Sequence, residues 1–82
     1  SFDAPADQAL WEALRAARLQ IARDQGVPPY AVFHDATLAA MVQHRPRSLD
    51  GLAALPGVGE RKLAAYGEQF LGVIAAQAGP PA

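Results

Sequence analysis

One segment says more about this chain than any other: Leu52-Ala-Ala-Leu-Pro-Gly-Val-Gly-Glu-Arg-Lys-Leu-Ala-Ala-Tyr66. It predicts a short helix, a Gly57-Val-Gly59 turn, and a second helix with Arg61 and Lys62 in its first turn. Glycine permits a sharp turn and a close partner because it has no Cβ. A helix start presents unpaired N–H groups and a partial positive charge, which suit a phosphate. Two interpretations follow: a nucleic-acid module, or a tight helix–helix corner without a ligand.

Size and charge restrict the possible functions. The 82 residues make one domain, and the absence of Cys leaves core packing alone to hold it. This composition fits a cytoplasmic protein, nucleoid-associated in a bacterium, or a nuclear one. Seven Lys and Arg against eight Asp and Glu give a net charge of −1. Because phosphate contacts dominate nucleic-acid affinity, any DNA binding should be weak, salt-sensitive and confined to a local patch.

The chain is expected to divide into a Pro/Ala-rich linker over residues 1–5, a domain over 6–78 and a flexible tail over 79–82. Ser1 as the first residue suggests a piece cut from a longer protein. No run approaches the roughly 20 apolar residues that span a bilayer, and no signal peptide is visible, so no membrane partner is expected. The isolated domain is expected to be a monomer.

The hydrophobic pattern is helical throughout. A first helix is predicted from about Asp7 to Gln25, ended by Gly26 and the following Pro28-Pro29. Trp11 is expected at the core edge with the stem of Arg18 laid across it, and ligand stacking is the alternative. The apolar stripe of this helix is Leu10, Leu14, Ala17 and Ile21.

Three further elements follow. Residues 27–33 predict a turn of 3₁₀ helix that buries Val32 and Phe33. Asp35 is the expected N-cap of a helix from Ala36 to about His44, which Pro46 ends. Its inward side chains are expected to be Leu38, Met41 and Val42, and Ser48 is expected to cap a short helix that carries Leu49, Leu52 and Leu55.

The last helix, from about Gly59 to Gln77, has the clearest periodicity. Gly67 lies within its apolar stripe, which indicates that another helix crosses tightly there. The stripe comprises Leu63, Tyr66, Gly67, Phe70, Leu71 and Ile74. The predicted fold class is therefore all-α: a compact bundle of four main helices plus one short 3₁₀ turn.

Four segments in this order resemble a known family: Val27-Pro-Pro-Tyr-Ala-Val-Phe-His-Asp-Ala-Thr-Leu38, Arg45-Pro, Leu55-Pro-Gly-Val-Gly-Glu-Arg-Lys-Leu63 and Tyr66-Gly-Glu-Gln-Phe-Leu71. They are similar to the HRDC (helicase and RNase D C-terminal) domain, best known from RecQ-type DNA helicases. The resemblance spans about residues 7–78.

The resemblance implies an accessory regulatory domain, with ATP hydrolysis and strand separation located elsewhere. It implies weak contact with single-stranded or branched DNA, and contacts with the helicase core of the same polypeptide that modulate DNA binding and unwinding. Two alternatives stay open: an RNase D-like parent, and a protein-interaction module without intrinsic DNA binding. Where the family contacts DNA, the tyrosine of Val-Pro-Pro-Tyr is implicated, which corresponds here to Tyr30, together with basic side chains around it.

Each candidate has an alternative role. Tyr30 can stack on a base or lie over Pro28-Pro29. Arg45 and Arg47 can complement a helix dipole or contact phosphate. The start of a helix disfavours cations, so Arg61 and Lys62 point to an anionic partner, with an Arg61–Glu68 surface pair as the competing explanation. The full nucleic-acid set is Tyr30, Arg23, Arg45, Arg47, Gly57, Gly59, Arg61 and Lys62.

The acidic residues form a second candidate set, because exposed carboxylates can dock against the basic surface of a DNA-binding motor. Simple solubility is the alternative explanation for them. No catalytic residue, cofactor or metal site is expected: His34 and His44 lack zinc-site spacing, and the carboxylates are scattered. The candidate interdomain contacts are Glu12, Asp24, Asp35, Glu60 and Glu68.

Overall fold

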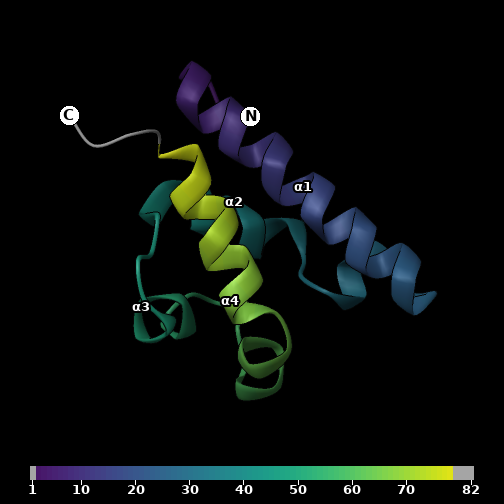
Figure 1. Cartoon of the computed structure of the whole chain (residues 1–82). Helices are drawn as coiled ribbons and strands as arrows, with labels where there is room; N and C mark the ends of the chain where they lie inside the picture. Colours follow the sequence, from purple (N-terminus) through teal and green to yellow (C-terminus); the bar gives the residue numbers. More distant parts are fainter. Residues whose placement is uncertain (1, 79–82) are drawn as a thin grey trace.

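The computed structural model describes residues 2–78, which form helices and no strand (Figure 1). The predicted all-α class and the predicted element count are confirmed. Ser1 and the expected flexible tail at 79–82 lie outside the described residues. In chain order the elements are α1 (Pro5–Gln25), the 3₁₀ helix η1 (Pro29–Ala31), α2 (Asp35–His44), α3 (Leu49–Ala53) and α4 (Glu60–Gln77).

Helix α1 begins at Pro5 rather than near Asp7. Proline suits the first helical position because its φ is preset and its missing N–H would have no partner there. Gly26 ends the helix in the left-handed conformation at φ 66°, as the sequence predicts. Phe2, within the expected linker, packs its ring 5.4 Å from that of Trp11, and its carbonyl accepts a hydrogen bond of 2.6 Å from Gln8.

Helix α2 starts one residue earlier than the sequence predicts, and its cap differs. His34 holds the N-cap position in extended conformation without a side-chain cap bond, and Asp35 is the first helical residue. The expectation that Asp35 caps α2 is therefore wrong. Its carboxylate instead lies 2.8 Å from Nη2 of Arg18 on α1.

Two ion pairs join α2 to α1 at opposite ends. Asp35 at the start of α2 pairs with Arg18, and Arg45 at its end pairs with Asp7 at 2.9 Å. Because Asp7 precedes Arg18 on α1 while Asp35 precedes Arg45, the two helices run antiparallel. The cation near the Trp11 ring is Arg15, with Cζ 6.0 Å from the ring centroid, and not Arg18 as expected.

The core forms where α1, α2 and α4 meet. Phe33, just after η1, is fully buried and meets Phe70 of α4 edge-to-face at 5.0 Å between ring centroids. The expected close crossing at Gly67 is confirmed: a Cβ there would lie 2.8 Å from Cδ2 of Leu49 on α3. Ser48 caps α3 by accepting the Gly51 N–H at 3.0 Å, also as predicted. Other fully buried side chains include Leu10, Leu14, Val32, Leu38, Met41 and Leu52.

Two classes of feature are absent from residues 2–78. None of their helices combines the length and the hydropathy that a membrane crossing requires. Within the same residues, no three His, Asp or Glu side chains gather closely enough to hold a metal ion.

Candidate nucleic-acid interface

The turn between α3 and α4 uses its two glycines differently. Gly57 has φ 83°, and a Cβ on it would overlap Oγ1 of Thr37 on α2. That hydroxyl donates a 3.0 Å hydrogen bond to the carbonyl of Pro56, so the turn is tied to α2. Gly59, the N-cap of α4, has an ordinary φ of −86° and nothing within 4 Å of a Cβ. Gly57 therefore serves the fold, while Gly59 leaves the backbone open to a partner.

The start of α4 offers unpaired donors beside two cations. Its N-cap is a glycine without a side-chain acceptor, and the amides of residues 59–62 have no hydrogen-bond partner within residues 2–78. Arg61 is exposed and not ion-paired with Glu68 or any other described carboxylate. Lys62 places Nζ 5.9 Å from the Phe33 ring centroid.

These groups surround a shallow open hollow of about 480 Å³. Unpaired amides, the positive end of a helix dipole and flanking cations together favour a phosphate oxygen. The sequence-predicted residues that the structure brings together here are Gly57, Gly59, Arg61 and Lys62, joined by Val58.

Tyr30 lies on η1 with 61% of its surface exposed. Its ring stacks on the imidazole of His34, with 5.8 Å between centroids and 25° between ring planes. This neighbour of the Tyr30 ring was not expected from the sequence, which suggested only the adjacent prolines or a nucleobase. The open part of the phenol ring remains available for stacking.

Arg45 and Arg47 lie at the other end of α2 from Tyr30. A ten-residue helix spans about 15 Å at about 1.5 Å per residue, so neither arginine adjoins the tyrosine. Arg45 has φ 44° and its guanidinium is engaged by Asp7, whereas Arg47 is exposed without an ion pair to a described residue. Arg23 is exposed in the last turn of α1, the end that leads into η1. The predicted cations thus form separate groups rather than one patch.

The five candidate docking carboxylates are all exposed. Asp35 pairs with Arg18, and Glu12 lies 3.6 Å from Arg15. Asp24 accepts a 3.0 Å hydrogen bond from Gln20. Glu60 and Glu68 make no ion pair with any residue in the described part of the chain.

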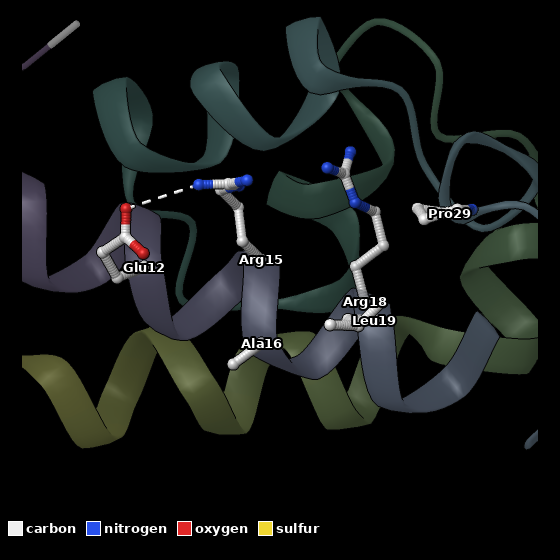
Figure 2. A pocket seen from close by; sticks show the side chains of 6 residues that line it. All are labelled: Glu12, Arg15, Ala16, Arg18, Leu19 and Pro29. Atoms are coloured by element: carbon white, nitrogen blue, oxygen red, sulfur yellow. Dashed lines mark ion pairs between the residues drawn. The ribbon is translucent and has the colours of Figure 1, made fainter. Parts of the chain in front are cut away.

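A second hollow, of about 320 Å³, lies along α1 and was missed by sequence analysis (Figure 2). Arg15 and Arg18 project from the same side of α1, with Pro29 near the guanidinium of Arg18 (Figure 2). Arg15 precedes Arg18 by three residues, and this spacing, which places two side chains on neighbouring positions of a helix surface, was a usable signal. The lining residues are Glu12, Arg15, Ala16, Arg18, Leu19 and Pro29.

Comparison with known proteins identifies the family. The sequence model of the HRDC domain family matches residues 7–74 of this chain. The chain belongs to the HRDC domain family. Over 69 residues it is 49% identical to the ATP-dependent DNA helicase RecQ of Bacillus subtilis, which covers 84% of this chain and 12% of that protein. Over 71 residues it is 41% identical to the ATP-dependent DNA helicase UvrD2 of Mycobacterium tuberculosis, covering 87% of this chain and 10% of that protein.

A solved structure agrees with this assignment. HRDC domain 3 of Deinococcus radiodurans RecQ superposes with a TM-score of 0.86 at 38% identity, covering 90% of this chain and 97% of that one. The resemblance predicted from the sequence is therefore confirmed. The HRDC chain described here spans about a tenth of the length of its curated relatives.

Proposed function

We propose that this HRDC domain is a non-catalytic accessory module of a RecQ-type ATP-dependent DNA helicase, where it contacts DNA weakly and modulates DNA binding and unwinding. The relatives above support a helicase parent, because each is named as an ATP-dependent DNA helicase and is matched over most of this chain. The likeness to UvrD2 adds a second helicase class to the candidate parents. An RNase D-like parent has no such support among these relatives.

The start of α4 is the observation that carries the DNA-binding part. Amides 59–62 have no acceptor among residues 2–78, and two cations that the helix dipole disfavours flank them. Glu60 in the same turn offsets part of this positive potential, while the open amides can still donate to an external anion. A DNA backbone supplies that anion without requiring any base sequence.

The charge balance limits the strength of this contact. Three of the seven basic side chains, Arg15, Arg18 and Arg45, are ion-paired within the domain. Of the remaining four, Arg61 and Lys62 share the α4 hollow, whereas Arg23 and Arg47 lie elsewhere. Few phosphates can therefore be neutralised at once, and affinity should fall as salt displaces them.

Titration of the chain with labelled single-stranded and branched DNA tests the proposal. Binding should be detectable at about 50 mM salt and much weaker at about 200 mM. Arg61→Ala should weaken binding and lower the salt slope by about 1, since one phosphate contact is lost. Arg15→Ala is the matched control, because it removes one arginine from a different surface. Equal losses in the two variants, or no binding at the lower salt, would refute this DNA contact.

Docking on the helicase core is the second candidate function. Glu60 and Glu68 on α4 are exposed and not ion-paired within the described residues, so they can meet a basic surface without first breaking an internal pair. Glu68→Lys in the full-length protein should alter unwinding through the reversed charge. An equal change in the DNA affinity of the isolated chain would assign the effect to DNA contact instead.

A further inference from the structure

The hollow along α1 contains a buried donor that has no acceptor (Figure 2). Arg18 is 8% exposed, and both of its terminal nitrogens are engaged. Nη1 donates a 3.0 Å hydrogen bond to the Phe33 carbonyl, and Nη2 lies 2.8 Å from the Asp35 carboxylate. Nε is buried and has no hydrogen-bond partner among residues 2–78. Buried donors are nearly always paired, so this N–H is suited to an acceptor from outside the described residues.

A second arginine on the same side of α1 is held only loosely (Figure 2). Arg15 precedes Arg18 by three residues, so the two side chains are neighbours on the helix surface. Among the described residues the carboxylate paired with Arg15 is that of Glu12, at 3.6 Å, which is too long for a hydrogen bond. Both side chains of this pair are more than half exposed. Surface pairs of this kind are weak, so an external carboxylate can take the place of Glu12 at little cost.

The rest of the hollow is apolar. Ala16, Leu19 and Pro29 line it, and Leu19 is a large hydrophobic side chain with 39% of its surface exposed. The volume of about 320 Å³ lies at the lower end of the range for ligand sites, about 300–1,000 Å³. The hollow therefore combines donors for one carboxylate with an apolar wall for a neighbouring side chain.

We propose that this hollow binds an acidic segment of a protein partner, in which an Asp or Glu lies next to an aliphatic residue. One carboxylate oxygen contacts the guanidinium of Arg15 and displaces Glu12, while the other accepts a hydrogen bond from Nε of Arg18. The aliphatic neighbour packs on Leu19 and Pro29. Because Nε is shielded from water in the free chain, the exposed side chains at the rim must turn as the segment binds. This contact does not depend on the proposed DNA contact.

The charges around the hollow favour a peptide carboxylate over a nucleic-acid backbone. Arg15 and Arg18 face the carboxylates of Glu12 and Asp35, so these four side chains carry no net charge together. A polyphosphate depends on an excess of positive charge and gains nothing from an apolar wall. A peptide carboxylate needs only the exchange with Glu12, which is exposed and can turn to water. Its aliphatic neighbour gains from burial against the wall.

Nitrogen–proton correlation NMR of the chain tests the proposal directly. The probe is a capped peptide of alternating Asp and Leu, and the matched control is the same peptide with Asn in place of Asp. The side-chain Nε–H signal of Arg18 should shift as the Asp peptide is added, because this N–H gains a charged acceptor. The backbone amide signals of α1 around the hollow should shift with it. The Asn peptide should cause much smaller shifts.

Variants separate this site from the effect of net charge. Arg15→Ala should weaken affinity for the Asp peptide by about two- to five-fold, the range expected for an exposed ion pair. Arg61→Ala removes the same charge from the start of α4 and should leave this affinity nearly unchanged. Glu12→Gln should strengthen binding by about two- to five-fold, because the competing carboxylate is gone. Glu68→Gln is its matched control, since it removes an exposed carboxylate far from the hollow in sequence.

Several outcomes would overturn the proposal. An unmoved Arg18 signal, or equal shifts with the Asp and Asn peptides, would exclude carboxylate binding at this hollow. Equal losses in Arg15→Ala and Arg61→Ala, or equal gains in Glu12→Gln and Glu68→Gln, would reduce the effect to net charge. A shift of the Arg18 signal by single-stranded DNA but not by the Asp peptide would assign the hollow to nucleic acid. Failure of the proposed DNA contact would appear in Arg61→Ala and leave the peptide result unaffected.

Discussion

Replacing Gly57 by alanine should destabilise the domain more than any other glycine substitution at a turn. Two costs combine at this position. The residue has φ 83°, a conformation that side chains other than glycine rarely adopt. In addition, the new Cβ would overlap the Thr37 hydroxyl, which is buried and bonded to the Pro56 carbonyl.

Gly26 separates the two costs, because it has φ 66° but nothing within 4 Å of a Cβ. Gly26→Ala should lower the free energy of unfolding by about 1 kcal/mol, the cost of the left-handed conformation after the smaller entropy of the unfolded alanine chain is subtracted. Gly57→Ala adds a displaced hydroxyl, a lost hydrogen bond and local overpacking. Its total loss should be about 2–4 kcal/mol.

Urea denaturation of both variants measures these losses, and a double-mutant cycle identifies their origin. In a Thr37→Ala background the overlapping hydroxyl is gone, so Gly57→Ala should fall to about the cost of Gly26→Ala, about 1 kcal/mol. Equal destabilisation by the two glycine variants in the wild-type background would refute the argument. So would an unchanged cost of Gly57→Ala after removal of the Thr37 side chain.

Three further predictions concern packing and charge. Phe70→Ala should lower the free energy of unfolding by about 3–5 kcal/mol, because removal of a fully buried ring in contact with Phe33 leaves a cavity. A loss below about 1 kcal/mol, measured by urea denaturation, would contradict this. Gly72→Ala should raise the free energy of unfolding by about 0.5–1 kcal/mol, because alanine has the higher helix propensity and its Cβ meets nothing there. Gly67→Ala should raise it less, because its Cβ would lie 2.8 Å from Leu49 Cδ2. Equal stabilisation of the two variants in thermal denaturation would argue against the tight crossing at Gly67. Asp7→Asn should lower the free energy of unfolding by less than about 1 kcal/mol, because the Arg45–Asp7 pair is partly exposed. Salt screens this pair, so the difference in stability between the variant and the wild type should shrink in urea denaturation at high salt. A loss of stability that does not depend on salt would contradict this.

Local signals were sufficient for most of the fold. Gly26, the capping Ser48 and the stripe on α4 act over a few residues, so their patterns predict element type well. The boundary at Asp35 was wrong for a non-local reason. A carboxylate at a helix start is an ordinary N-cap, but here the guanidinium of Arg18, 17 positions earlier, takes it.

The candidate site was predictable only in part. The turn that joins Gly57, Gly59, Arg61 and Lys62 is contiguous in sequence, and the structure gathers these residues around one hollow. The separation of Arg45 from Tyr30 follows from the length of α2, which lies between them, whereas the pairing of Arg45 with Asp7 depends on how α2 crosses α1. Nor did the residue types of Tyr30 and His34 reveal that their rings stack.

The amino-acid sequence by itself determined the helical class and the anion-favouring chemistry at the start of α4, since each depends on neighbours within about two helical turns. It also determined the family, through the order of four short segments along the chain. Tertiary structure alone decided which cations remain free, which glycine is sterically obligatory and what backs the exposed tyrosine. Those properties arise from side chains that meet across helices, as in Thr37 against Gly57 and Arg18 against Asp35. These contacts between helices are fixed by how the whole bundle buries its apolar surface, and no local sequence pattern encodes them.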